Sequence, residues 1–346
     1  MNYTQLGRTG LLVSEVCLGT MNFGRRMDEA DSHECMNKAL ELGINFFDTA
    51  DVYGLDATPP KRGLTEEMIG NWFAQDATRR EEVVLATKCW NAMTTNEGVN
   101  NRGVSARHIK LACEASLKRL KTDTIDVYIM HHIERTTPFD EIWQAMEQLV
   151  REGKILYVGS SNFPAWQIVK ANELAKQRHF LGLVCEQSPF NLTERMLEME
   201  VMPACKDYGV GVMAYGSIGG GMLAGGVIER AEKKMGRSGM SPRFIKKVEA
   251  NKDAIIAYEN LCKEIGEHPL EVAMSWMAAH QGVCTSVVGP SAVSQLDQYV
   301  RGAELRLDAE VFEKLDQLWP GPGGEAPEAY SWGKKVLPQF SYNNNE

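Results

Sequence analysis

An aspartate, a tyrosine, a lysine and a histidine stand at or just beyond the ends of short apolar runs in this chain. In the stretch NFFDTADVYG, Asp48 follows two phenylalanines and Tyr53 comes five residues later. Two further apolar runs end in Lys88 and in His131. A free tyrosine has a pKa of about 10, and a buried ammonium nearby favours the phenolate and lowers that pKa. With Asp48 keeping the lysine charged, such a set can protonate a carbonyl oxygen while another group attacks the carbon.

Each of these residues taken alone also has an ordinary structural explanation. Asp48 can cap a loop, Lys88 can be exposed, and His131 can be a core histidine with satisfied hydrogen bonds. The chemical interpretation therefore depends on whether the fold brings the four side chains together.

The pattern of apolar runs predicts eight strands, each followed by a helix. The expected strands cover residues 16–19, 46–48, 83–88, 125–131, 155–160, 182–186, 211–215 and 284–288. Eight regular units without a linker favour a (β/α)8 TIM barrel over the alternative, a doubly wound sheet. We expect one domain over residues 1–346, which opens with a hairpin whose strands YTQLG and LLVSEV flank the turn RTG.

Helical patterns fill the intervals between the expected strands. They cover residues 31–42, 65–73, 106–120, 139–152, 165–175, 195–208, 253–265, 270–279, 293–302 and 309–318. The Pro- and Gly-rich residues 318–346 are expected to form an irregular tail.

A barrel places its chemistry at the carboxyl ends of its strands. Polar groups follow the ends of the expected strands, and they are Asp48 with Tyr53, Lys88, His131 with His132, Ser160 to Asn162, Glu186 with Gln187, and Tyr215. The fold therefore predicts that the four residues of the first paragraph meet in one site.

Composition narrows the class of protein. The 346 residues carry a net charge of −9, which disfavours a nucleic-acid partner. No run approaches the roughly 20 apolar residues of a membrane span, and the N-terminus lacks an apolar signal segment, so we expect a cytoplasmic protein without a membrane partner. The eight cysteines contain no C-x-x-C pair and no ligand cluster, which predicts reduced thiols and no metal. No pattern in the sequence sets the oligomeric state.

These motifs, in this order, resemble the aldo-keto reductase family along nearly the whole chain. NFFDTADVYG resembles the family's Asp-x-x-x-x-Tyr signature, LATK its lysine motif, and DVYIMHH its histidine strand. The resemblance implies reduction of an aldehyde or ketone by NADPH, with Tyr53 as general acid assisted by Asp48, Lys88 and His131.

The resemblance also implies how the cofactor is held. VGSSNF and EQSPFNL resemble motifs that contact the nicotinamide carboxamide, and AYGSIGGGMLAGG resembles a loop that lies along the pyrophosphate. The implied cofactor contacts come from Thr20, Met21, Asp48, Ser161, Asn162, Gln187, Tyr215, Gly216, Ser217, Ile218, Gly219, Gly221, Gly289, Ser291 and Gln295. The tract 219–224 also fits a dinucleotide fingerprint, but no acidic residue ends a second strand about 20 residues later.

Two departures from the family pattern concern the adenosine end of the cofactor. In VVGPSAVSQLDQYV, Ala292 replaces the arginine that usually meets the 2′-phosphate, and Tyr299 replaces the asparagine that reads the adenine. A lost guanidinium–phosphate contact weakens the preference for NADP(H). NADP(H) remains the first expectation, NAD(H) stays open, and a basic residue from 233–247 is a second source of charge.

The substrate is expected to be a small carbonyl compound in a pocket lined by Met21, Trp90, His132 and loop residues between Cys89 and Ser105. For Trp90, a place in the apolar core is an equal alternative. Within the family, LGTMNFG, KILYVGSSNF and the tail resemble a bacterial branch that acts on sugar-like and polycyclic ketones. Two other functions stay open at this point. One is a cofactor-sensing binding subunit of the same fold with little turnover, and the other is a barrel isomerase or aldolase that uses Lys88 as a Schiff base.

Overall fold

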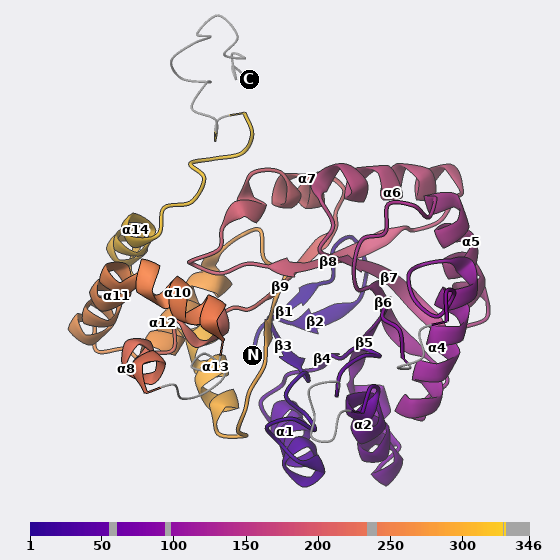
Figure 1. The fold of residues 1–346 in the computed structure, drawn as a ribbon, viewed down its shortest axis with the longest axis horizontal. Coiled ribbons are helices and arrows are strands. Elements are labelled where there is room, and N and C mark those ends of the chain that lie inside the picture. The colour runs from indigo at the N-terminus through magenta and orange to yellow at the C-terminus, as the bar shows by residue number, and fades with distance from the viewer. Residues whose placement is uncertain (55–60, 94–97, 234–240, 328, 330–346) are drawn as a thin grey trace, which may run out of the picture.

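Eight parallel strands close into a barrel, as the sequence predicts. The computed structural model describes residues 1–54, 61–93, 98–233, 241–327 and 329. The strands are β3 (Val16–Gly19), β4 (Phe46–Asp48), β5 (Val84–Cys89), β6 (Ile125–Met130), β7 (Ile155–Ser161), β8 (Leu183–Pro189), β9 (Gly211–Tyr215) and β10 (Thr285–Val288). They pair in the order β10-β3-β4-β5-β6-β7-β8-β9, and β9 pairs with β10 to complete the circle (Figure 1).

The predicted hairpin covers the amino end of the barrel. Its strands β1 (Tyr3–Gln5) and β2 (Leu12–Ser14) are antiparallel, and Leu6 and Val13 pack among the side chains that fill the barrel. Gly7 sits at φ 57°, and a Cβ there would lie 2.4 Å from the carbonyl oxygen of Val184. Only glycine fits this approach, so the hairpin is held directly against the strand starts.

Helices surround the barrel on all sides. They are α1 (Glu29–Glu41), α2 (Leu64–Gln75), α3 (Thr78–Glu82), α4 (Ala106–Leu120), α5 (Phe139–Arg151), α6 (Ala165–Gln177), α7 (Val201–Asp207), α8 (Val227–Glu232), α10 (Pro242–Ala250), α11 (Lys252–Glu264), α12 (Pro269–Ala279), α13 (Gln295–Glu304) and α14 (Ala309–Leu318). In Figure 1, α1 and α2 lie below the barrel, α4 and α5 to its right and α6 and α7 above it, while α8 and α10 to α14 gather to its left. No helix in the described ranges is both long and apolar enough to cross a membrane.

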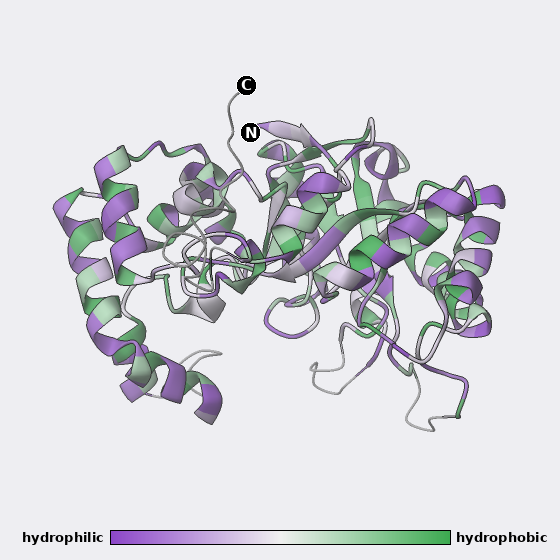
Figure 2. Cartoon of the chain, turned by 90° about the horizontal axis from the view of Figure 1, so that it is seen from above, coloured by the Kyte–Doolittle hydropathy of each residue, from purple (hydrophilic) through white to green (hydrophobic). Residues whose placement is uncertain are grey.

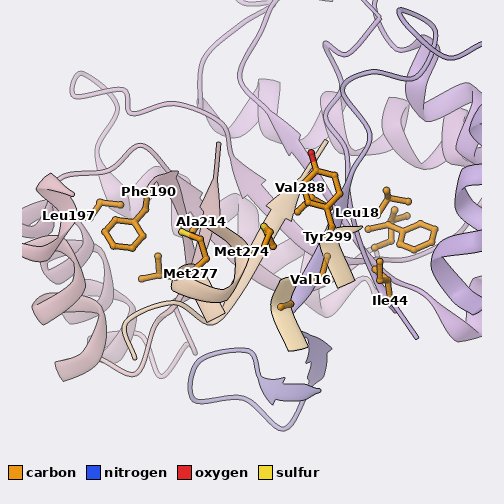
Figure 3. Packing of buried hydrophobic residues seen from close by; sticks show 14 of the residues in the cluster. Val16, Leu18, Ile44, Phe190, Leu197, Ala214, Met274, Met277, Val288 and Tyr299 are labelled. Atoms are coloured by element: carbon orange, nitrogen blue, oxygen red, sulfur yellow. The ribbon is translucent and has the colours of Figure 1, made fainter. Parts of the chain in front are cut away.

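The apolar core has two layers. An inner cluster fills the barrel, and a larger cluster lies between the strands and the helices. Figure 2 shows apolar and polar residues alternating along the outer helices, which is typical of helices that bury one face. Figure 3 shows part of the outer layer, where Leu18, Val288 and Tyr299 gather near β3 and Met277 packs near Phe190.

Two parts of the helix prediction are wrong. The expected helix 195–208 is divided into a 3-10 turn at Met196–Glu198 and α7. Pro203 has no amide hydrogen and would clash with the carbonyl of residue 199 in a continuous helix, so a new helix starts just before it. The sequence prediction also omits α3, α8 and α10, which are short and lie in the connections. After α14, residues 319–327 contain no helix or strand, and most of the expected tail lies outside the described residues.

Candidate active site

Strand periodicity brings the polar residues to one place. In a strand, residues two apart share a face, so a residue that follows an inward side chain by two positions also points inward. Six site residues each come two positions after a residue on the inner face of the barrel. The pairs are Phe46 and Asp48, Ala86 and Lys88, Ile129 and His131, Gly159 and Ser161, Cys185 and Gln187, and Met213 and Tyr215. The first residue of each pair, except Gly159, belongs to the inner cluster. A Cβ on Gly159 would meet Cys185 and Ile129, so this position faces inward as well.

The centre of the site is a buried ion pair that holds a phenol. Lys88 has no exposed surface, and its Nζ lies 2.7 Å from Oδ2 of Asp48. The same ammonium donates to the carbonyl oxygen of Thr49 at 2.8 Å and to Oη of Tyr53 at 3.2 Å. All three donor hydrogens of Lys88 are therefore used. The hydroxyl hydrogen of Tyr53 has no acceptor among the residues that the structure describes.

Burial and charge act in opposite directions on this pair. Burial alone would lower the pKa of Lys88, but Asp48 and Tyr53 raise it above its ordinary value, so the lysine is an ammonium. For Tyr53 the sequence expectation is wrong in sign. Burial raises the pKa of the phenol, and the nearby Lys88 offsets only part of that rise. Tyr53 is consequently protonated at neutral pH, as an acid must be before it donates.

His131 stands beside the phenol as a neutral ring. The rings of Tyr53 and His131 are 6.0 Å apart between centroids and nearly perpendicular at 78°. Burial, with the charge of Lys88, lowers the pKa of His131 to about 2. Nδ1 of His131 lies 3.4 Å from the side-chain amide nitrogen of Asn91, which donates a hydrogen bond to it. The ring proton is therefore on Nε2, where it is available as a hydrogen-bond donor.

The two consecutive histidines do not point to opposite faces, as they would in a continuing strand. β6 ends at Met130, and the rings of His131 and His132 stack at 4.8 Å with an angle of 2°. Trp90 packs edge-on against the exposed His132 at 5.1 Å. The expected pocket residues Trp90 and His132 thus form a continuous aromatic wall that leads to His131.

A second group of polar side chains lies on β7, β8 and β9. Asn162, at φ 61°, donates to Oγ of Ser161 at 2.9 Å and to the carbonyl oxygen of His131 at 3.2 Å. It accepts from the hydroxyl of Tyr215 at 2.8 Å. The side-chain amide of Gln187 donates to Oδ1 of Asp48 at 2.8 Å, and its side-chain oxygen Oε1 has no donor in the described part of the chain. The buried Ser161 hydroxyl has no acceptor within the same described ranges.

The glycine-rich loop after β9 is open on one side. Gly216 has φ 72° and is exposed, and a Cβ there would touch nothing. Ser217 is buried, with its hydroxyl near the carbonyl oxygens of Ala214 and Val287, so its side chain faces the barrel wall. Ile218 leads into the 3-10 turn Gly219–Gly221, which contacts α10 because Phe244 lies next to Gly220.

The loops after β3 and β10 lie side by side. Asn22 donates to the carbonyl oxygens of Gly289 at 2.9 Å and Pro290 at 3.0 Å. Gln295 accepts from the backbone amide of Ser291 at 2.7 Å and so stabilises this loop. In the loop after β3, Thr20 is buried and donates its hydroxyl hydrogen to the carbonyl oxygen of Asp48, while Met21 is partly exposed.

The two departures from the family pattern have different environments. Ala292 is exposed. Tyr299 is 3% exposed within the outer apolar layer, and burial raises its pKa to about 12 (Figure 3). The ring of Tyr299 therefore packs in the core.

Several residues of the site carry no sequence signal. Asn91 selects the tautomer of His131, and the carbonyl of Thr49 receives a hydrogen bond from Lys88. The sequence places Glu186 only at a strand end, whereas in the structure it is fully buried. Burial raises its pKa to about 7, although several hydrogen bonds to the carboxylate act to lower it. Asp51 is also buried, but it takes no part in the Asp48–Lys88 ion pair. Its burial and, to a smaller extent, the negative charge of Glu66 raise the pKa of its carboxyl group. In the described ranges, no three His, Cys, Asp or Glu side chains gather as metal ligands would.

Comparison with known proteins places this geometry in a family. A model of the aldo/keto reductase family matches residues 15–320. The chain is 47% identical over 337 residues to the uncharacterized oxidoreductase YrpG of Bacillus subtilis (strain 168), covering 96% of this chain and all of YrpG. Norsolorinic acid reductase B of Dothistroma septosporum is 30% identical, covering 94% of this chain and 83% of its own. A probable voltage-gated potassium channel subunit beta of Oryza sativa subsp. japonica is 28% identical, covering 92% and 96%.

Replacing Lys88 by methionine should strongly destabilise the protein. The substitution keeps the volume but leaves Asp48 as a buried charge without its partner, which typically costs about 3–5 kcal/mol. The measurement is the free energy of unfolding from urea denaturation. Lys154→Met is the matched control, because Lys154 pairs with Glu114 and Glu152 at the surface and should lose far less. Equal losses in the two variants would contradict a buried Asp48–Lys88 pair.

The ring of His131 should not titrate near neutral pH. Its lowered pKa means that it stays neutral as the pH falls through the ordinary value of 6.5 and gains a proton only toward about 2. Histidine ring resonances followed by NMR from about pH 8 down to about pH 5 should include one that does not shift. That resonance should be missing in His131→Gln. A titration of the assigned signal near 6.5 would show that the ring is solvated.

Proposed function

Because this chain is an oxidoreductase that belongs to the aldo/keto reductase family, we propose that it reduces an aldehyde or ketone to an alcohol with a reduced nicotinamide dinucleotide. NADP(H) is the first choice of cofactor and NAD(H) the alternative. The observation that carries the proposal is the hydrogen bond from Lys88 to Tyr53, which fixes the phenol oxygen and leaves its hydrogen for a substrate.

The polar groups on β7 and β8 suit a nicotinamide carboxamide. A carboxamide has one acceptor oxygen and one amino group that donates. Ser161 has a hydroxyl hydrogen to give, and Gln187 has a carbonyl oxygen to accept, so the two groups are complementary to it. We assign Asn162 to the same contact, Tyr215 to the face of the ring, and the open loop at Gly216 to the phosphates.

The chain's own residues then perform the proton transfer. When bound, the reduced nicotinamide supplies the hydride that adds to the carbonyl carbon. Tyr53 donates its proton to the carbonyl oxygen, and the ammonium of Lys88 stabilises the phenolate that remains. Neutral His131 donates a hydrogen bond from Nε2 to the same oxygen and orients it. Trp90 and His132 form one wall of the substrate pocket, which sugar-like and polycyclic ketones are candidates to fill.

Two other functions remain to be compared with this proposal. A Schiff base needs an unprotonated lysine, whereas Lys88 is an ammonium with three acceptors, which disfavours an aldolase. The relatives named as potassium channel beta subunits support the second, a cofactor-sensing subunit with little turnover. Stable copurification with a stoichiometric partner, together with slow single turnovers, would favour the sensing subunit.

Removing the phenol oxygen should remove the reaction but not the fold. In Tyr53→Phe the ring remains while the proton donor is lost, and general acid catalysis is worth about 10² to 10⁴ in rate. The measurement is loss of reduced-nicotinamide absorbance with NADPH or NADH over a panel of aldehydes, sugar ketones and polycyclic ketones. Cofactor binding, followed by quenching of protein fluorescence, should stay within about twofold of the parent. Turnover close to that of the parent would contradict the role of Tyr53.

Restoring an arginine at position 292 should tighten the binding of NADPH selectively. A hydrogen bond to a charged group contributes roughly 1.5–3 kcal/mol, which is about 10- to 100-fold in affinity. Dissociation constants of both cofactors at fixed salt should show this gain for NADPH in Ala292→Arg and almost none for NADH. Ala292→Met is the control for side-chain length without charge.

One result with the parent protein would contradict the prediction for Ala292→Arg. A strong preference for NADPH in the parent, unchanged by the arginine, would mean that another cation meets the 2′-phosphate. The N-terminal end of α10 is the nearest candidate region, because Phe244 already contacts the glycine-rich loop.

A further inference from the structure

Glu186 is a completely buried carboxylate with an unusual set of partners. It has no exposed surface. Its Oε2 accepts a hydrogen bond from Oγ of Ser160 at 2.5 Å, and its Oε1 accepts from Oγ of Ser188 at 2.5 Å. The backbone amide of Phe163 donates to Oε1 at 3.1 Å. Among the described residues, no lysine or arginine pairs with it, so hydrogen bonds alone balance its charge.

The partners of Glu186 come from both sides of one turn. Ser160 lies near the end of β7, just before the turn that leads to α6. Phe163 follows Asn162, the residue of this turn with a positive φ, and Ser188 lies on β8. Helix α6 has Pro164 at its N-cap position, with no side chain capping its first amides. A carboxylate bound just before this helix is favourably placed with respect to the helix dipole. Glu186 therefore ties the end of β7 to the start of α6.

The turn that Glu186 fixes contains residues assigned above to the carboxamide. Ser161 and Asn162 lie between Ser160 and Phe163, and Asn162 is in the left-handed region at φ 61°. Gln187 follows Glu186 on the same strand and points to the opposite face, into the barrel. One carboxylate behind the wall thus sets the positions of three side chains in front of it.

We propose that Glu186 is a positioning residue for the nicotinamide end of the cofactor, which it never touches. The inference rests on the proposed function, since it needs a dinucleotide whose carboxamide meets Ser161, Asn162 and Gln187. Without the carboxylate, Phe163 loses the acceptor for its amide and two buried hydroxyls lose theirs. The turn then relaxes, and the carboxamide contacts lose their alignment while the distant adenosine end keeps its contacts.

The test compares two ligands that differ only in the nicotinamide ring. NADPH carries it, and 2′-phospho-ADP-ribose does not. In Glu186→Ala the affinity for NADPH should fall by about 10-fold or more, because two hydrogen bonds of ordinary strength lose their geometry. The affinity for 2′-phospho-ADP-ribose should stay within about twofold of the parent. In steady-state kinetics, kcat should also fall at saturating NADPH, because the reactive ring is held less well.

A second variant guards against loss of folding. Glu186→Gln keeps the shape and one acceptor oxygen, while the hydroxyl of Ser160 can rotate to accept from the new amide. This variant should show the same selective effect at about 3-fold. The control is Glu271→Gln on α12, a carboxylate that is 3% exposed and pairs with Arg301. It should lower thermal stability and leave both affinities unchanged.

The outcomes separate this inference from the proposed function. Equal weakening of both ligands in the Glu186 variants, or no weakening of either, would overturn the positioning role while the parent still reduces carbonyls. A parent that binds neither NADPH, NADH nor 2′-phospho-ADP-ribose would overturn the proposed function and this inference with it. A loss confined to NADPH and absent in Glu271→Gln is the result we expect.

Discussion

The ammonium of Lys88 has no contact with solvent, and an uncompensated charge in that position would cost several kcal/mol. The barrel must therefore bring an anion and further acceptors within hydrogen-bond distance of one atom. Asp48 provides the anion from the neighbouring strand, in the register that pairs it with Ala86, two residues before the lysine. A shift of β4 by one residue would turn Asp48 out of the barrel and leave the lysine unpaired. Strand register and the state of the phenol consequently depend on the same ion pair.

Around this pair, the barrel divides into two arcs with different tasks. Strands β4, β5 and β6 lead to Asp48, Lys88 and His131, which belong to the proposed proton-transfer group. Strands β7 to β10, with β3, carry open loops and amide side chains. Side-chain hydrogen bonds cross between the arcs, among them those from Gln187 to Asp48, from Asn162 to the carbonyl of His131 and from Thr20 to the carbonyl of Asp48. These bonds connect the amide side chains to the Asp48–Lys88 pair, and the Glu186 carboxylate with Ser160, Ser188 and the backbone amide of Phe163 forms a second network behind the wall.

At the end of the second arc, three residues that align with one family motif have different environments. Gln295 is engaged with the backbone of its own loop, Tyr299 is part of the core, and Ala292 is exposed. The loop after β10 is thus well formed but presents little charge of its own. Under the proposed function, selectivity for a 2′-phosphate at this end would depend on cations that other elements bring to it.

The order of residues predicted the barrel and placed Asp48, Lys88, His131 and Gln187 at or just beyond the ends of its strands, because strand periodicity is a local property. Tyr53 lies in a loop, where periodicity gives no orientation, so its place in the site rested on its chemistry near Asp48 and on the resemblance to the family's Asp-x-x-x-x-Tyr motif. Three properties emerge only in the folded chain. Burial outweighs Lys88 and raises the pKa of Tyr53, the rings of His131 and His132 stack, and Glu186 accepts hydrogen bonds from Ser160 and Phe163 beside the turn before α6. These properties depend on solvent exclusion and on distances between segments far apart in the chain, and no local pattern of residues contains them.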